Sequence, residues 1–442
     1  MSDSSSATER LLALLEHLGI GKAHVATQIS GDIAGLATTH AERLGGIVLC
    51  APVRLDPAPF TSIAERVLMI SGEYGPTFEV CLRAADRLAG AERYVLDSYE
   101  ALGWSDVAAD RNAEIAAALT GFLQHHGADA PPCSVAEGSH AGISYKVEGS
   151  GPALLLLPFF LAPSQWAPVV PQLAQHFTVV TLGGRHLGGI TALEDRASMP
   201  TYRAMFRTLI DLIAPQPGEA ILDIGCGAGS LDRQLAQRLG SANPITAIDV
   251  NPFWLREAEA LAIEDGVAGT IRFLPGNAEA VPFPDNSFDA VFSVTVLEEC
   301  DADRAIAEMA RVTRPGGRIG IVVRATDLPQ WWNLDLPDSP EGRPIRRKVT
   351  PPPQSVAAKG VADASLYRRM KRAGLADLTC FPTLVTLDRP DGPIWRCRED
   401  YVLSLLDPEE LAVWQAARSE ARQQGLLMMA HPLHAGVGRM PK

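Results

Sequence analysis

The chain lacks the features that bind nucleic acids or cross membranes. Its formal net charge is −13, and no run of Lys or Arg is long enough to follow a phosphate backbone. Its longest apolar runs, such as ALLLLPFFLA, are too short to span a bilayer. The first residues show neither a basic stretch nor a small-residue cleavage site, and their apolar residues fall at helical spacing. We therefore expect a cytoplasmic protein with no nucleic-acid partner and no membrane span.

Cysteine is also sparse and unpaired. The chain has 7 cysteines, an odd number, and none of them forms a CxxC pair. Such a distribution indicates free thiols in a reducing compartment and excludes a disulfide framework or a zinc site of the usual spacing. No metal is expected.

Two domains are expected from length alone. The chain has 442 residues, and single hydrophobic cores stop growing at roughly 250–300 residues. Apolar residues make up 47% and charged residues 21% of the chain, which is ordinary for folded proteins. A stretch around residues 191–200 loses the strand pattern and is the expected boundary.

A glycine-rich turn stands halfway along the chain. A buried-strand pattern ends in Asp223 and is followed by Gly225, Gly227 and Gly229, and then by a helical pattern. Glycines at alternate positions let the backbone turn sharply and approach a ligand closely. The dinucleotide fingerprint G-x-G-x-x-G is absent, because Ser230 occupies its third place. The turn thus indicates a ligand without a pyrophosphate.

Strands and helices alternate after this turn. The next strand pattern, PITAIDV, contains Asp249. Its distance along the chain from Asp223 is close to the roughly 20 residues at which an acidic residue reaches a ribose hydroxyl in nucleotide-binding α/β folds. Three further strand patterns follow, in TIRFLPG, NSFDAVFSV and GRIGIVVRA. This alternation predicts an α/β fold with a doubly wound parallel sheet whose ligand lies at the carboxyl ends of the strands.

Four segments in this order resemble one family. LDIGCGAG, AIDVNPFWL, GNAEAVPFPDNSFDAVFS and EMARVTRPGGR are similar to the class I S-adenosylmethionine-dependent methyltransferases, especially the subgroup around the quinone C-methyltransferases. The resemblance extends from about Thr201 to the C-terminus and implies a Rossmann-like methyltransferase domain over residues 200–442. It implies S-adenosylmethionine as cofactor and in-line methyl transfer to a small-molecule acceptor. A sulfonium donor needs no metal.

The resemblance also implies a cofactor site. The glycine turn, with Asp223, would hold the methionine end, and Asp249 would accept both ribose hydroxyls. Asn277, at a position where relatives more often carry Asp, would accept a hydrogen bond from the adenine amino group. Val250 and Ala278 would lie on the two sides of the adenine ring. The complete set is Asp223, Gly225, Cys226, Gly227, Gly229, Asp249, Val250, Asn277 and Ala278.

Acceptor and catalytic residues are expected after the fourth and fifth strands. Glu298 and Glu299 stand where relatives carry other polar or aromatic residues, so they indicate either a basic or hydroxylated acceptor or a helix N-terminal acid pair. Arg324, with Asp327 nearby, is expected to contact substrate or to form an ion pair. These groups should converge on one cavity.

Aromatic and histidine residues supply further candidates. Trp331 and Trp332 are two large aromatics in DLPQWWNLDLP, which is predicted to be a polar loop. They are interpreted as a lid over an apolar or planar acceptor, with plain packing as the alternative. His431 and His434, in a last strand, are either core histidines or acceptor-contacting residues, with His434 the candidate base.

The first half of the chain resembles an α/β-hydrolase with its halves in reversed order. Residues 8–125 match the second half of that fold and residues 141–190 the first, which predicts one domain over residues 1–195. The strand Ala153–Leu157 should then lie parallel to, and inside, the sheet formed by residues 23–96. This domain would scaffold, dimerise or cover the methyltransferase.

Hydrolase chemistry is missing from this half. The elbow reads Thr27-Gln-Ile29-Ser30-Gly31, which places Ile29 at the nucleophile position, and Pro158 stands at the oxyanion turn. The leading interpretation is a small-molecule methyltransferase. Two alternatives stay open: a catalytically silent cofactor-binding or regulatory protein, and a hydrolase with an unusual nucleophile such as Ser30. The sequence identifies neither the acceptor atom nor the oligomeric state, and a homodimer is left open.

Overall fold

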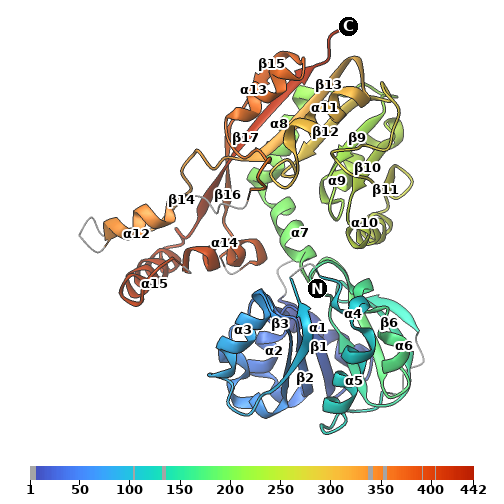
Figure 1. Ribbon diagram of the computed structural model, residues 1–442, viewed down its shortest axis with the longest axis vertical. Coiled ribbons are helices and arrows are strands. Elements are labelled where there is room, and N and C mark those ends of the chain that lie inside the picture. The colour runs from blue at the N-terminus through green and yellow to red at the C-terminus, as the bar shows by residue number, and fades with distance from the viewer. Residues whose placement is uncertain are drawn as a thin grey trace. The chain divides into compact units, whose positions relative to one another are not determined.

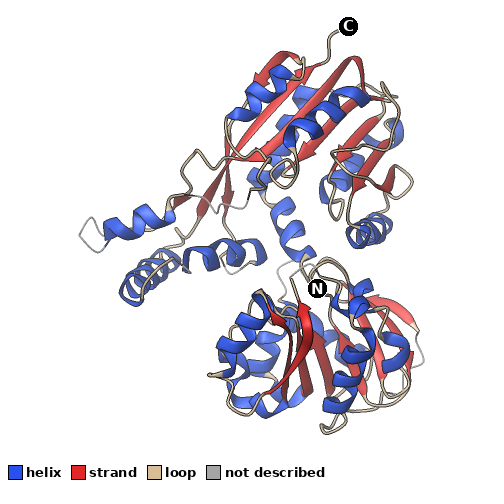
Figure 2. Cartoon of the chain, viewed as in Figure 1, coloured by secondary structure: helices blue, strands red, loops and turns tan. Residues whose placement is uncertain are grey.

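The computed structural model describes residues 6–102, 105–131, 136–336, 342–351, 356–390, 392–403 and 405–442. The chain divides into two compact units, Met1–Thr191 and Ala192–Lys442. Each unit has a sheet with helices packed against it (Figure 1, Figure 2). No helix in these described ranges is both long and apolar enough to span a membrane.

In unit 1, the described strands form one 8-stranded sheet of order β4-β3-β2-β1-β7-β8-β6-β5. The strands are β1 (Ala23–Thr27), β2 (Leu44–Cys50), β3 (Val67–Tyr74), β4 (Glu92–Glu100), β5 (Glu137–His140), β6 (Ile143–Gly149), β7 (Ala153–Leu156) and β8 (Thr178–Gly183). The helices are α1 (Ala7–His17), α2 (Gly31–Thr39), α3 (Pro76–Ala85), α4 (Val107–Asp110), α5 (Asn112–Leu123) and α6 (Val170–Leu173), with 3-10 turns at Ala41–Arg43, Ala58–Arg66 and Pro163–Trp166.

The centre of this sheet joins segments that are far apart in sequence. β7 pairs in parallel with β1, with His24 opposite Leu154, and also in parallel with β8. Every residue of β1, β2 and β7 is buried, as is usual for strands covered on both faces. The prediction that Ala153–Leu157 lies parallel within the sheet of residues 23–96 is confirmed for the strand as the structure bounds it.

Helices cover both faces of the unit 1 sheet. The core on one face includes side chains of α1, α2 and α3, and the core on the other includes side chains of α5 and α6. A capping box starts α1: the Ser6 hydroxyl accepts from the Glu9 N–H at 3.2 Å, and the Glu9 carboxylate accepts from the Ser6 N–H at 2.7 Å.

In unit 2, the described strands form a 9-stranded sheet of order β11-β10-β9-β12-β13-β17-β14, with β15 and β16 also paired to β17. The strands are β9 (Ile221–Ile224), β10 (Ile245–Asp249), β11 (Ile271–Pro275), β12 (Phe288–Val294), β13 (Thr313–Arg324), β14 (Trp331–Trp332), β15 (Ala376–Cys380), β16 (Thr383–Leu387) and β17 (Met429–Arg439). The helices are α7 (Ile190–Ser198), α8 (Pro200–Ile213), α9 (Ser230–Leu239), α10 (Pro252–Glu264), α11 (Ala302–Val312), α12 (Gly342–Val349), α13 (Ser365–Arg372), α14 (Pro393–Leu403) and α15 (Pro408–Gln423), with a 3-10 turn at Gly240–Ala242.

The strands from β9 to β13 are parallel, and β17 is antiparallel to β13. Side chains of α8, α9 and α10 join the core on one face, and those of α11 and α13 join the core on the other. The doubly wound sheet predicted from the sequence is therefore present, and the carboxyl ends of β9, β10 and β12 lie along one edge.

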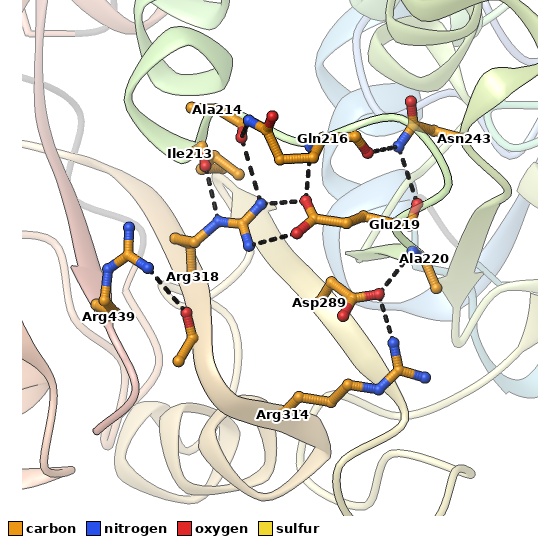
Figure 3. Close-up of polar contacts among 11 residues, drawn as sticks. Ile213, Ala214, Gln216, Glu219, Ala220, Asn243, Asp289, Arg314, Arg318 and Arg439 are labelled. Atoms are coloured by element: carbon orange, nitrogen blue, oxygen red, sulfur yellow. Dashed lines mark hydrogen bonds and ion pairs between the residues drawn. The ribbon is translucent and has the colours of Figure 1, made fainter. Parts of the chain in front are cut away.

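The opposite edge, at the amino ends of the strands, is held by ion pairs (Figure 3). Arg318, on β13, donates to the Ile213 carbonyl at 2.8 Å and to the Glu219 carboxylate at 3.0 Å. Asp289 accepts from the Ala220 N–H at 2.9 Å and also binds Arg314. These contacts fasten the segment between α8 and β9 to the sheet, away from the edge where ligands are expected.

Candidate functional site

The glycine turn between β9 and α9 has a backbone that favours glycine. Gly225, Gly227 and Gly229 have φ values of 82°, 54° and 68°. A Cβ on Gly225 would lie 2.2 Å from Val296 Cγ2, and one on Gly229 would lie 2.8 Å from the Phe273 ring. At Gly227 the nearest atom would be 3.4 Å away. Packing therefore excludes side chains at the two outer glycines, while the middle one leaves room for a ligand against the backbone.

Asp249, at the carboxyl end of β10, is fixed beside this turn. One carboxylate oxygen accepts from the Gly227 N–H and the other from the Asn251 N–H, each at 2.9 Å. Burial raises the pKa of Asp249, and these backbone N–H groups oppose that shift. Each oxygen keeps a second lone pair for a ribose hydroxyl. Next to it, Val250 is 67% exposed, an apolar surface suited to an adenine ring.

Asn277 and Ala278 follow β11. The Asn277 side-chain oxygen accepts a hydrogen bond from the Glu279 N–H at 2.8 Å, and this local turn orients the side-chain amide. The oxygen keeps one lone pair for an adenine amino group. Ala278 is buried in the core beneath α11. It therefore presents much less surface to a ring than Val250 does.

A buried carboxyl pair lies beneath the turn, and the sequence analysis missed one member of it. Asp223, on β9, and Asp232, on α9, are both buried. Burial, followed by the proximity of Asp232, raises the pKa of Asp223 well above its ordinary value, and burial raises the pKa of Asp232 to about 7. Two close buried carboxyl groups cannot both ionise cheaply, so the pair keeps a proton to higher pH than an isolated carboxyl group does. The sequence signal that could have identified Asp232 is its position, since it is an acidic residue in the first turn of α9, directly after the glycine turn.

Cys226 lies within the turn and keeps its proton. Burial, then the nearby carboxylates Asp232 and Asp223, raises the pKa of this thiol well above its ordinary value. A protonated thiol is a poor nucleophile and a poor metal ligand. Among the described residues, no cluster of His, Cys, Asp or Glu could hold a metal ion.

The first helix of unit 2 is tied to the turn by a network that includes a buried arginine. Arg233, on α9, donates to the Glu194 carboxylate at 2.6 Å and to Asp265 at 2.8 Å. Glu194, on α7, also accepts from the Ser230 hydroxyl. These bonds hold α7 over the glycine turn and thereby place Arg196, which follows Glu194 by two residues on α7.

A cavity lies beyond the carboxyl ends of β12 and β13. The space in it that a water-sized sphere can occupy is about 20 Å³, within a partly open region of about 350 Å³ that no atom fills. Its polar lining residues are Arg196, Tyr202, Thr295, Arg324, Arg398 and His431. Its apolar lining residues are Val385, Leu387, Ile394 and Leu433. Thr295 links it to the cofactor site, since the next residue, Val296, packs against Gly225.

The glutamate pair binds Arg324 instead of lining the cavity. Glu298 is fully buried; its carboxylate accepts from the Arg324 N–H at 2.6 Å and lies 3.4 Å from Arg324 Nε. Glu299, which is exposed, lies 2.7 Å from the same guanidinium. Burial raises the pKa of Glu298, and Arg324 opposes that shift. The convergence of these three residues was expected. Asp327, however, pairs elsewhere, and neither glutamate lines the cavity.

His434 does not face the cavity, which corrects its selection as candidate base. Its two ring nitrogens contact the Tyr367 hydroxyl at 2.9 Å and the Asp327 carboxylate at 2.7 Å. His431 lines the cavity instead, and both of its ring nitrogens lack a hydrogen-bond partner. Residues three apart on a strand lie on opposite faces, so only one of the two histidines can meet the site.

The two tryptophans form a strand, which contradicts the loop predicted for them. Trp331 and Trp332 make up β14, paired with Ala430 and Met429 of β17. The Trp332 ring packs edge-on against Trp395 and Trp414, with centroids 5.5 and 5.0 Å apart. Trp332 is a core residue, whereas Trp331 is 49% exposed. Neither lines the cavity, so the lid prediction is wrong for Trp332 and has no support for Trp331.

Unit 1 lacks the geometry of a hydrolase elbow. Ser30 has φ −56° and ψ −27°, an ordinary helical conformation and not a strained one. Its hydroxyl lies 3.4 Å from the Arg54 carbonyl. At the turn where an oxyanion would bind, the Phe160 N–H already donates to the Gln28 side chain at 2.7 Å. Neither a nucleophile nor a free oxyanion donor is presented there.

The parallel sheet, the glycine turn and the carboxylate after the second strand define a class I S-adenosylmethionine-dependent methyltransferase, with S-adenosylmethionine as its cofactor. The family model described as "Methyltransferase domain" matches residues 222–321. The chain is 37% identical over 128 residues to the ubiquinone/menaquinone biosynthesis C-methyltransferase UbiE of Hahella chejuensis, covering 29% of this chain and 51% of that protein. It is 31% identical over 195 residues to UbiE of Stutzerimonas stutzeri, covering 40% of this chain and 76% of that protein. The chain belongs to this methyltransferase family, although it spans only about half the length of the Hahella relative.

Two solved structures are similar over the same part of the chain. The YcgJ protein of Bacillus subtilis is 20% identical, with a TM-score of 0.37, covering 54% of this chain and 99% of that one. A geranyl diphosphate methyltransferase in complex with SAM is 20% identical, with a TM-score of 0.33, covering 54% of this chain and 85% of that one.

Proposed function

We propose that unit 2 transfers the methyl group of S-adenosylmethionine to a small-molecule acceptor bound in the cavity described above. One observation carries the proposal: the segment Thr295-Val296 contributes to both sites, with Val296 against the glycine turn and Thr295 in the cavity wall. Donor and acceptor held on the two sides of this segment would be adjacent. Positioning of this kind is the main requirement of methyl transfer.

The cofactor, when bound, supplies a methyl group already activated by a sulfonium sulfur. The chain's own residues bind and orient it. Asp249 would accept hydrogen bonds from the ribose hydroxyls, Asn277 would accept one from the adenine amino group, and Val250 would contact the ring with its exposed side chain. The Asp223–Asp232 pair lies beneath the turn, where a positively charged amino acid end, once bound, would favour the ionised form of the pair. The apolar walls of the cavity keep water from the reacting centre.

A proton leaves the acceptor if the reacting atom carries one. His431 is the base that the geometry supports, because it lines the cavity with two unpartnered ring nitrogens. Burial, then Arg398, Arg324 and Arg196, lowers its pKa well below the ordinary value. The ring is therefore neutral, with one nitrogen able to accept a proton, but it is a weaker base than an ordinary histidine.

Calorimetry with S-adenosylhomocysteine tests the cofactor site. We expect binding by the full chain and a large loss of affinity in Asp249→Ala. A chain that binds the compound but transfers no methyl group to any acceptor in a metabolite mixture would support the alternative of a silent cofactor-binding protein. Failure to bind at all would overturn the methyltransferase proposal.

We further propose that residues 1–195 are a degenerate α/β-hydrolase-like domain whose halves stand in reversed order, followed by a methyltransferase domain over residues 200–442. Support comes from the junction of the halves: β1, the strand before the elbow position, lies beside β7 in one continuous sheet. A serine-directed fluorophosphonate probe should leave Ser30 unlabelled. Labelling of Ser30 would favour the hydrolase alternative.

A further inference from the structure

One helix, α7 (Ile190–Ser198), borders both the glycine turn and the acceptor cavity. The Cδ1 atom of Leu193 lies 3.4 Å from the place that a Cβ on Gly227 would take. Three residues later, Arg196 lines the acceptor cavity, and its guanidinium carbon is 5.0 Å from the centre of the Tyr202 ring. The same short helix is therefore part of the wall of the donor site and of the acceptor site.

In this position α7 leaves little room for ligands. The space in the acceptor cavity that a water-sized sphere can occupy is about 20 Å³, and one buried water molecule needs about 10–15 Å³ of such space. An organic acceptor does not fit there unless part of the wall moves. A ligand against the Gly227 backbone would likewise meet the Leu193 side chain. Movement of α7 would make room at both places.

The attachment of α7 to the rest of unit 2 is mainly polar. All nine of its residues are described, and none belongs to the hydrophobic core on either face of either sheet, although Ile190 and Ala197 are buried. Two other residues of the cavity lining, Tyr202 on α8 and Leu433 on β17, are core members. Segments with few apolar contacts are the ones that open locally in folded proteins. Among these elements, α7 is thus the one able to move without disrupting a core.

Glu194 makes the best-shielded of the polar attachments of α7. Its carboxylate oxygens accept from the Arg233 guanidinium at 2.6 and 2.7 Å, and one of them also accepts from the Ser230 hydroxyl. The Arg233 side chain is only 3% exposed, so this ion pair is shielded from water and salt. The neighbouring residue Asp195 instead pairs at 3.1 Å with Arg389, whose side chain is half exposed, and such a pair contributes little.

We infer that α7 is a gate shared by the donor and acceptor sites, and that Glu194 is the positioning residue that latches this gate through Arg233 and Ser230. The inference rests on the proposed function for the identity of the two ligands. With the latch released, S-adenosylmethionine reaches the glycine turn and the acceptor cavity widens. With the latch formed again, the gate closes over both ligands and excludes water from the reacting centre. Leu193 then covers the donor and Arg196 the acceptor.

Hydrogen exchange on the full chain, followed by mass spectrometry, tests the gate. In the free chain, the amides of α7 should exchange at least about tenfold faster than those of the core helix α8, and saturation with S-adenosylhomocysteine should slow them by about tenfold or more. Glu194→Gln keeps the shape of the side chain but removes its charge, so it should speed the exchange of α7 in the free chain by about tenfold.

Asp211→Asn is the matched control. It removes an exposed ion pair to Arg238, which lies on the same helix as Arg233, and it should leave the exchange of α7 unchanged. Glu194→Asp keeps the charge, so partial retention of slow exchange in that variant separates a lost latch from a folding defect. Circular dichroism checks the fold of each variant.

The rate at which the donor leaves gives a second readout. Tritiated S-adenosylmethionine, displaced by an excess of unlabelled S-adenosylhomocysteine, should leave Glu194→Gln about tenfold faster than it leaves the unmodified chain or Asp211→Asn. A merely structural role of Glu194 would lower the melting temperature without this selective change in dissociation.

The outcomes separate the gate from the proposed function. Exchange of α7 as slow as that of α8, or unchanged by bound S-adenosylhomocysteine, would overturn the gate and leave the methyltransferase proposal standing. Equal dissociation rates from Glu194→Gln and Asp211→Asn would overturn the latch. Absence of S-adenosylhomocysteine binding would count against the proposed function, and the exchange of the free chain would still decide whether Glu194 holds α7.

Discussion

His431 and His434 lie on opposite faces of β17, three residues apart, with different partners. His434 is held between Tyr367 and Asp327 at 2.9 and 2.7 Å, whereas His431 faces the acceptor cavity with no hydrogen bond. The two side chains therefore have separate roles: His434 links α13 and the segment that follows β13 to β17, and His431 is available to a ligand.

This pair gives the first prediction. His431→Asn should lower the turnover of methyl transfer while leaving S-adenosylhomocysteine affinity and the unfolding free energy nearly unchanged. His434→Asn should instead destabilise the fold by roughly 1–3 kcal/mol, because buried partners lose their hydrogen bonds. Urea denaturation and steady-state kinetics on both variants check this. The reverse pattern would return His434 to the role of base.

A second prediction concerns Asp249. Asp249→Ala removes the acceptor expected for two ribose hydroxyls and should cost about 1.5–3 kcal/mol of binding free energy for S-adenosylhomocysteine. Asp211→Ala, an exposed position on α8 that pairs with Arg238, is the control and should bind normally. Titration calorimetry measures both. Unchanged affinity in Asp249→Ala would remove this residue from the cofactor site.

A third prediction follows from the buried Asp223–Asp232 pair. Because burial raises the pKa of Asp232 to about 7, the folded state binds its proton more tightly than the unfolded state does. Ionisation of the folded pair is therefore unfavourable, and the ligand-free protein should lose stability as pH rises from the ordinary carboxyl pKa to about 7.

Asp232→Asn should reduce this pH dependence. The variant cannot ionise at that position, so its unfolding free energy should change less between these pH values than that of the unmodified chain. Urea denaturation at several pH values, with the two proteins compared at each, isolates the contribution of the pair. Identical pH profiles for the two proteins would show that folding does not raise the pKa of Asp232.

A fourth prediction contrasts the two adjacent tryptophans. Trp332→Ala removes a ring packed against Trp395 and Trp414 and should destabilise the fold by about 3–5 kcal/mol. Trp331→Ala changes a half-exposed side chain and should have a small effect. Thermal denaturation compares them directly. A loss of turnover in Trp331→Ala at unchanged stability would restore a lid role for that residue alone.

The sequence by itself was enough to predict the residues proposed to bind the cofactor. Asp223, the glycines and Asp249 lie within two strand–helix units, where the order of residues along the chain almost dictates their order in space. A glycine that must adopt positive φ and an acidic residue that ends a strand are local requirements, visible without any distant contact. The parallel entry of β7 beside β1 was also predictable, because a half sheet would leave an apolar strand edge unpaired.

Only the tertiary structure decided the acceptor side. Arg196, Arg324, Arg398 and His431 come from four elements spread over more than half of unit 2, and nothing local marks them as neighbours. The period of β17 shows that His431 and His434 point in opposite directions, but not which face meets the cavity. The sequence around Trp332 predicts a loop aromatic, because the residues that bury it, Trp395 on α14 and Trp414 on α15, lie far along the chain. Burial depends on what packs against a residue in space and not on its neighbours in sequence.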